Sequence, residues 1–166
     1  DWTTSELNKI NLNTNYINYL SNINIKWANM IETTTWHLGG MDDDNYTAKT
    51  FYVGERNNAG YGSNPTTYRD EIGLMYPSDY GYAASPENWT TELIYYDNST
   101  NTNNNWMYMG LDELTITPYS SSSSHVFLMG YYGHLLSSTA DYGYAARPVF
   151  YLESNVQLEG GSGTSS

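Results

Sequence analysis

Cysteine is absent from this sequence of 166 residues, and basic residues are few. Without cysteine there is no disulfide, no thiolate zinc ligand and no thiol nucleophile. Six lysines and arginines stand against eighteen acidic residues, and the formal net charge is −12. Nucleic acids and anionic membrane surfaces attract clustered basic residues, whereas the six here are scattered along the chain. The composition therefore argues against both as partners.

Long apolar runs are also missing. No stretch approaches the roughly 18 apolar residues of a membrane span, and these 166 residues contain no signal-peptide pattern. We therefore expect no membrane insertion by this chain. Because the sequence opens at Asp1 without a methionine, we expect a processed product or an excised domain.

Tyrosine and tryptophan supply much of the apolar content that remains. The hydrophobic share is 39%, with 18 tyrosines among these residues, and charged residues make up only 14% of the chain. Such side chains bury large areas while keeping a polar group. Solubility must then come from Asn, Ser, Thr and Tyr side chains, helped by the negative net charge. This composition indicates an extracellular or cell-surface location.

The first part of the chain carries a helical pattern. Leu7 and Ile10 lie three residues apart, and residues 16–20 repeat the same spacing. The sequence TTSE at residues 3–6 fits a capping box, with a threonine three residues before a glutamate. These signals predict helices within residues 3–31.

Beyond residue 31 the pattern changes to short runs separated by turn residues. Residues 33–38 indicate a strand that ends at two glycines, and residues 71–76 (EIGLMY) indicate a buried strand that stops at Pro77. Residues 48–55 fit either a helix or a strand. Later strand-like runs lie at residues 114–117, 125–129, 135–136 and 148–152, and loops are expected at residues 41–47, 57–67 and 97–105.

These patterns predict a single α+β domain over residues 1–166, with helices concentrated before residue 35 and mostly short antiparallel strands after residue 70. Residues 148–152 (PVFYL) should form a buried strand, which would place Phe150 in the core. Arg147 should be structural and should bind a carboxylate or a backbone carbonyl, because cations are few and acids many.

One hexapeptide occurs twice. The sequence DYGYAA stands at residues 79–84 and again at residues 141–146. Two copies 62 positions apart are too few for a repeat architecture. We therefore expect the same local turn to be used twice.

Motifs for catalysis and metal binding are missing. The sequence has no nucleophile elbow and no phosphate-binding glycine loop, and its three histidines are far apart. The acidic run Asp42, Asp43 and Asp44 lacks the alternation and the glycine of an EF-hand loop. We expect no enzyme activity, no cofactor and no metal site, although calcium binding at this run and a carboxylate pair among the eighteen acids stay open.

Two phrases resemble a known group of proteins. Residues 72–83 (IGLMYPSDYGYA) and residues 146–156 (ARPVFYLESNV), followed by GGSGT at 160–164, are similar to phrases of uncharacterised surface domains from gut Firmicutes. The opening, from Ser5 to Trp36, also fits. The resemblance covers nearly the whole chain.

That resemblance implies a C-type-lectin-like fold in its bacterial form, related to formylglycine-generating enzymes. N-terminal helices would pack on a small twisted, mainly antiparallel sheet. The related enzymes work through cysteines, so their activity does not carry over to this chain. Relatives also have a cysteine pair in the insert that corresponds to residues 84–105, and they continue beyond GGSGT into a further strand.

The late region has the composition of a binding surface. Between Trp106 and Tyr144, tyrosine, serine, histidine and aspartate alternate with an apolar framework, as in antibody paratopes. In C-type-lectin-like proteins this region carries the ligand face, and in some of them retroelements diversify it. We expect one exposed or half-exposed patch that binds a protein or glycan: Tyr119, His125, Tyr131, Tyr132, His134, Tyr142 and Tyr144.

This composition therefore predicts a non-catalytic extracellular recognition module, such as an adhesin or a diversified binder of a bacterial or phage surface protein. Two alternatives stay open. The chain could be a structural subunit or tip domain of a surface filament or cell-wall protein, assembling with other surface subunits. The tyrosines could also simply fill a core that is poor in aliphatic residues.

Overall fold

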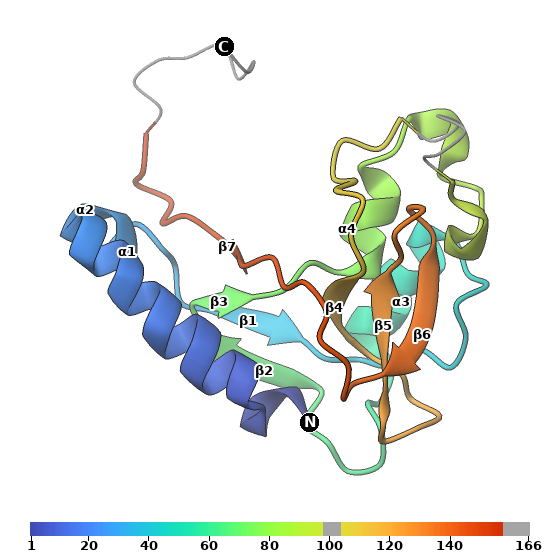
Figure 1. Cartoon of the computed structure of the whole chain (residues 1–166), viewed down its shortest axis with the longest axis horizontal. Coiled ribbons are helices and arrows are strands. Elements are labelled where there is room, and N and C mark those ends of the chain that lie inside the picture. The colour runs from blue at the N-terminus through green and yellow to red at the C-terminus, as the bar shows by residue number, and fades with distance from the viewer. Residues whose placement is uncertain (98–103, 158–166) are drawn as a thin grey trace.

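The N-terminal residues form a helical arm. The computed structural model describes residues 1–97 and 104–157, and the arm lies along one side of the molecule (Figure 1). It confirms the helices expected within residues 3–31. Its elements are η1 (Trp2–Thr4), η2 (Leu7–Tyr16), α1 (Ile17–Ile23) and α2 (Ile25–Ala28).

The start of the arm differs from the expected capping box. The carboxylate of Asp1 accepts a hydrogen bond from the backbone N–H of Thr3 at 3.0 Å and so caps η1. The hydroxyl of Ser5 accepts a hydrogen bond from the N–H of Asn8 at 3.2 Å. The predicted pairing of residues 3 and 6 is therefore wrong, and Ser5 satisfies the free donor at the next helix start.

Helix η2 has π geometry, in which each N–H bonds to the carbonyl five residues earlier. Leu7, Leu12 and Ile17, which are five apart, consequently turn toward the same apolar cluster. Ile10, which an α-helical spacing would place on the same face as Leu7, is exposed. The five-residue spacing replaces the three-residue spacing that the sequence analysis used.

A pair of amide side chains fixes the arm to the rest of the protein. The Oδ1 atom of Asn13 accepts a hydrogen bond from the N–H of Ile72 at 2.8 Å, and its Nδ2 donates to the carbonyl of Ile72 at 2.9 Å. The same Nδ2 lies 2.7 Å from Oδ1 of Asn8, which is fully buried. Because each amide is satisfied, burying them costs little.

Three small antiparallel sheets form the rest of the framework. Strand β1 (Thr34–His37) pairs with β2 (Thr67–Asp70), and β3 (Ile72–Gly73) pairs with β7 (Val149–Phe150). The largest sheet has the order β4 (Glu113–Pro118), β5 (His125–Met129) and β6 (Leu135–Thr139). The structure is therefore a mixed α+β fold with small antiparallel sheets. The loop expected at residues 97–105 lies largely outside the described residues.

The remaining helices cover one face of the largest sheet, β4–β5–β6. Residues 48–55, left open between helix and strand, belong to helix α3 (Ala48–Asn57), which Thr47 caps through the N–H of Thr50. Helix α4 (Pro77–Tyr82) follows, and two short turns come later, η3 (Pro86–Asn88) and η4 (Leu93–Tyr95). Among the described residues no helix combines the length and apolar character that a membrane span requires.

Two apolar clusters stabilise the fold. The first joins α3, α4 and the large sheet through Phe51, Tyr80 and Phe127. The second joins the helical arm to β1 and β3. Val149 packs against both clusters.

The two predicted buried strands behave differently. Residues 72–76 are all buried, as expected, although only Ile72 and Gly73 are in a strand. Residues 150–152 are exposed, and Phe150 keeps 38% of its surface. The prediction that Phe150 is a core residue is therefore wrong, because β7 lies at the edge of a two-stranded sheet and, of its two residues, only Val149 packs against the clusters.

Arg147 is structural, as predicted. Its Nε donates to Oε1 of Glu113 at 2.6 Å, and a terminal nitrogen of the guanidinium lies 2.5 Å from Oε2 of the same carboxylate. That nitrogen also donates to the carbonyl of Met107 at 2.8 Å. The planar guanidinium thus ties three separate segments together.

Candidate functional site

None of the seven residues predicted to bind a ligand is buried, and whether all seven form one patch stays a prediction. They lie in three groups defined by ring contacts: Tyr119 with His125, Tyr131 with Tyr132 and His134, and Tyr142 with Tyr144.

The length of β5 separates the first two groups. His125 begins this strand opposite Thr139, and Met129 ends it opposite Leu135, next to the turn that carries Tyr131 and Tyr132. At about 3.3 Å per residue, the strand puts roughly 13 Å between the groups. The sequence showed which side chains were exposed but not at which end of the sheet they lie.

Hydrogen bonds hold the turn between β5 and β6. The N–H of Gly130 donates to the carbonyl of His134 at 2.7 Å, and the N–H of Gly133 donates to the carbonyl of Gly130 at 2.8 Å. Gly133 has a φ of 91°, which other residues rarely adopt. This backbone directs the exposed rings of Tyr131 and Tyr132 outward in a T-shaped pair with centroids 5.1 Å apart.

A neighbouring segment is fastened to the same turn. The carboxylate of Asp112 accepts a hydrogen bond from the N–H of Tyr131 at 2.7 Å, and the hydroxyl of Tyr108 donates to the carbonyl of Tyr131 at 2.8 Å. Both bonds use the backbone of Tyr131, so they hold the turn without covering the ring.

This segment adds apolar side chains that the sequence analysis missed. Trp106 is 79% exposed, and Met109 and Leu111 are also largely exposed. The available signal was the run WMYMGL at residues 106–111, whose apolar residues follow no strand alternation. We call the five exposed apolar and aromatic side chains of the two joined segments the tip surface: Trp106, Met109, Leu111, Tyr131 and Tyr132.

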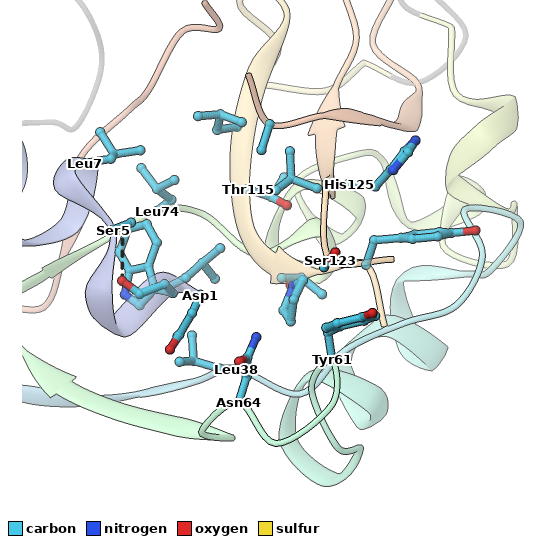
Figure 2. A pocket seen from close by; sticks show the side chains of 18 of the residues that line it. Asp1, Ser5, Leu7, Leu38, Tyr61, Asn64, Leu74, Thr115, Ser123 and His125 are labelled. Carbon is cyan, nitrogen blue, oxygen red and sulfur yellow. Dashed lines mark hydrogen bonds between the residues drawn. The ribbon is translucent and has the colours of Figure 1, made fainter. Parts of the chain in front are cut away.

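A separate cleft of about 430 Å³ lies between the start of the helical arm and the large sheet (Figure 2). Leu114, Ile116 and Val126 contribute from the sheet, and Trp2 and Leu7 contribute from the arm. Two of the predicted site residues, Tyr119 and His125, also line it. No sequence pattern predicted this cleft, because its walls come from segments that are far apart in the sequence.

Mostly uncharged groups form the polar part of the cleft. Tyr61 and Asn64 lie on the loop at its lower edge in Figure 2, and Ser122 and Ser123 lie between β4 and β5. Asp1 is the one acidic residue in the lining, and none of the lining residues is a lysine or arginine.

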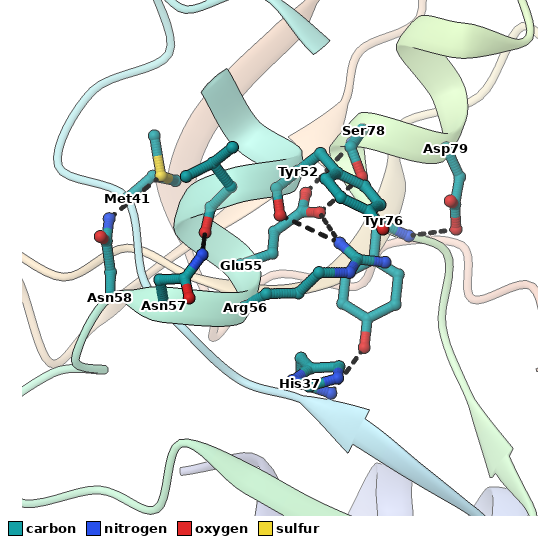
Figure 3. Close-up of polar contacts among 11 residues, drawn as sticks. His37, Met41, Tyr52, Glu55, Arg56, Asn57, Asn58, Tyr76, Ser78 and Asp79 are labelled. Atoms are coloured by element: carbon teal, nitrogen blue, oxygen red, sulfur yellow. Dashed lines mark hydrogen bonds and ion pairs between the residues drawn. The ribbon is translucent and has the colours of Figure 1, made fainter. Parts of the chain in front are cut away.

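A buried carboxylate joins α3 to α4 (Figure 3). Oε1 of Glu55 accepts a hydrogen bond from the N–H of Ser78 at 3.1 Å, and Oε2 accepts one from the Ser78 hydroxyl at 2.5 Å. Arg56 lies 3.1 Å from Oε2 and places its guanidinium 3.6 Å from the ring centre of Tyr52. Burial raises the pKa of Glu55 to about 7.

This pairing of a serine with a carboxylate is sealed from solvent. Neither Glu55 nor Ser78 has any exposed surface. A nucleophile and its base must be able to reach a substrate. The contacts of Glu55 therefore satisfy one N-terminal donor of α4, the N–H of Ser78, and they make Glu55 a structural residue.

The acidic run at residues 42–44 folds onto its own neighbours. Asp43 accepts a hydrogen bond from the N–H of Asp44 at 2.7 Å, and Asp42 accepts one from the hydroxyl of Tyr46 at 3.1 Å. Burial and the adjacent Asp43 raise the pKa of Asp44. Within residues 1–97 and 104–157 no group of three histidine or acidic side chains is placed to hold a metal ion.

Comparisons with protein-family models, curated proteins and solved structures found no match for this chain.

Proposed function

We propose that this protein is a non-catalytic extracellular recognition module that binds a protein or glycan through the tip surface. We further propose that its α+β architecture is a variant of the C-type-lectin-like fold of bacterial surface proteins. The observation that carries the functional proposal is the pair of exposed tyrosines on a turn whose backbone is already fixed.

Exposure and rigidity together support binding. Isolated exposed apolar residues are common, but several on two joined segments mark recognition surfaces. Tyrosine loses little conformational entropy on contact because it has only two side-chain torsions. Asp112 and Tyr108 hold the backbone of Tyr131 before any ligand arrives, which lowers the entropic cost of association.

The negative charge of the protein limits the kinds of ligand that the tip surface can bind. The chain has a formal net charge of −12, and Asp112 lies directly beneath the turn. A strongly anionic partner would be repelled over the distances at which exposed charges act. A neutral glycan, or a protein surface that is neutral or basic, complements the tip surface best.

The test is a glycan and protein array probed with the purified chain and with a double variant, Tyr131→Ala with Tyr132→Ala. The bonds that hold the turn use backbone atoms of Tyr131, so the variant should keep its melting temperature. Binding should fall by more than about tenfold, since aromatic residues dominate binding hot spots.

The matched control removes two exposed aromatic rings from the helical arm, Tyr19→Ala with Trp27→Ala. Tyr19 is 59% exposed and Trp27 is 50% exposed, and the arm lies on the other side of the molecule (Figure 1). Array binding should survive in this control. Equal loss in both double variants would contradict a specific role for the tip surface.

The alternative function, a structural subunit of a surface assembly, is favoured by the same arm. Tyr19, Ile23 and Trp27 are spaced four apart and are all at least half exposed. If the protein binds nothing on the array but self-associates with rising concentration, and the arm variant abolishes this, the subunit function replaces recognition.

A further inference from the structure

We propose that the cleft between the helical arm and the large sheet binds a small uncharged ligand with an apolar body and a hydroxyl or carbonyl group at its outer end. This site is separate from the tip surface and would serve a different kind of ligand.

The size and walls of the cleft fit such a molecule. Its volume of about 430 Å³ falls in the range of small-molecule sites. Leu114 and Val126 line it but are only half-buried, so the fold leaves apolar surface of β4 and β5 uncovered. Covering this surface would give the apolar ligand most of its binding energy.

The walls are built by two parts of the protein that are held in place. Leu7 lies on the arm that Asn13 fixes to β3, and Leu74 follows β3 in the chain. Figure 2 shows Leu7 and Leu74 on one side of the cleft and Thr115 of β4 on the other. The cleft is therefore formed before a ligand arrives.

The charges of the cleft lining and of the whole chain disfavour an anionic ligand. With no lysine or arginine in the lining, a carboxylate, sulfonate or phosphate would find no permanently charged side chain to pair with. The carboxylate of Asp1 is engaged by the backbone and the hydroxyl of Thr3, at 3.0 Å each. An uncharged molecule avoids both the desolvation cost and the repulsion by the net negative chain.

The polar residues at the outer edge of the cleft determine at which end the ligand should carry its oxygen atom. Tyr61 and Asn64 line the lower edge in Figure 2, and their side chains make no hydrogen bond to another described residue. An amide and a phenol can each donate to or accept from a hydroxyl or carbonyl group. The apolar body would then lie against Leu114 and Val126, with its oxygen toward this loop.

Nile red is a suitable probe because it is uncharged, apolar and carries a carbonyl group. Titration of the full chain with Nile red should give a saturable increase in fluorescence with one site. The sulfonated dye 1-anilinonaphthalene-8-sulfonate should bind at least about tenfold more weakly. Equal binding of the two dyes, or no saturable binding of Nile red, would overturn the proposal.

Filling the cleft gives the decisive variant. Val126→Trp should weaken Nile red binding by about tenfold or more. The matched control is Leu136→Trp, at a half-buried residue of the same sheet that does not line the cleft. If Val126→Trp fails to fold, Ser123→Trp replaces it, because Ser123 lines the cleft but is exposed.

The double variant Tyr131→Ala with Tyr132→Ala separates this proposal from the proposed function. It should leave Nile red binding unchanged, while the cleft variants should leave array binding unchanged. Nile red binding that is lost with the two tyrosines and kept in Val126→Trp would place the dye on the tip surface and refute the cleft site.

Discussion

The two copies of DYGYAA have the same six residues and different structures. Residues 79–84 belong largely to helix α4, and Tyr80 at the second position is 1% exposed. Residues 141–143 form an exposed turn after β6, and Ala145 makes a bridge to Glu113. Tyr142 at the matching position is 67% exposed. The expectation of one turn used twice is wrong for the first copy.

The difference arises outside the hexapeptide. Pro77 occupies the first helical position of α4, where its fixed φ is favourable. Glu55 satisfies the next donor, the N–H of Ser78. The second copy has no such start and is followed by Arg147 and Pro148, and a residue before proline avoids helical geometry. Local sequence here permits two structures, and tertiary contacts choose between them.

Replacing the second residue of each copy by alanine should give the largest contrast in the free energy of unfolding. Tyr80→Ala should lower the free energy of unfolding by about 3–5 kcal/mol, because it empties a site in the first apolar cluster. Tyr142→Ala should change it by less than about 0.5 kcal/mol. Urea denaturation of both variants measures the difference, and similar losses would show that the second copy is also packed.

The carboxylate that supports the first copy should make stability depend on pH. Burial raises the pKa of Glu55 from 4.5 to about 7. Between these values the folded protein keeps a proton that the unfolded chain has released, so the free energy of unfolding falls as pH rises. The total fall attributable to this group is about 3 kcal/mol. Urea denaturation across this pH range measures it.

The variant Glu55→Gln should remove this part of the pH dependence, because glutamine resembles the neutral acid and keeps both contacts with Ser78. Asp79 and Arg56 are present in both proteins, so the difference between the two curves reports the titration of Glu55 together with its interactions with these two charges. Glu87→Gln, at an exposed acid of η3, is the control and should leave the curve unchanged. A parallel curve for Glu55→Gln would refute the raised pKa.

Substituting the glycine of each copy by alanine should give the smallest contrast in stability, and the two effects should have opposite signs. A Cβ at Gly81 would lie 2.5 Å from the Cβ of Ala48, so Gly81→Ala should destabilise the protein by about 1–3 kcal/mol. A Cβ at Gly143 meets nothing within 4 Å, and Gly143→Ala should stabilise it by about 0.4–1 kcal/mol. Thermal melts compare the two, and destabilisation by Gly143→Ala would contradict an open turn.

The sequence predicted those elements whose signals are local. The helical arm, strand β1 and the strands β4 to β6 follow from spacing and from bounding turn residues. Helix α4 was missed because Pro77 was interpreted as the end of a strand, although proline also begins helices. Phe150 was misplaced because apolar sequence does not tell an edge strand from a central one.

For the candidate site, composition predicted exposure but not position. Tyr131 and Tyr132 are exposed between two glycines, as turn chemistry indicates. Their distance from His125 depends on strand register, and the contribution of Trp106 depends on hydrogen bonds from Tyr108 and Asp112. Such contacts between distant segments have no counterpart in local patterns.

The amide of Asn13 has a consequence for solubility. Strand β3 pairs with β7 on one side only, and Asn13 occupies both the N–H and the carbonyl of Ile72. An unpaired strand edge is a template on which another chain can add a strand and start aggregation. By imitating a neighbouring strand with one side chain, Asn13 closes that edge where the peptide would otherwise recruit a second molecule.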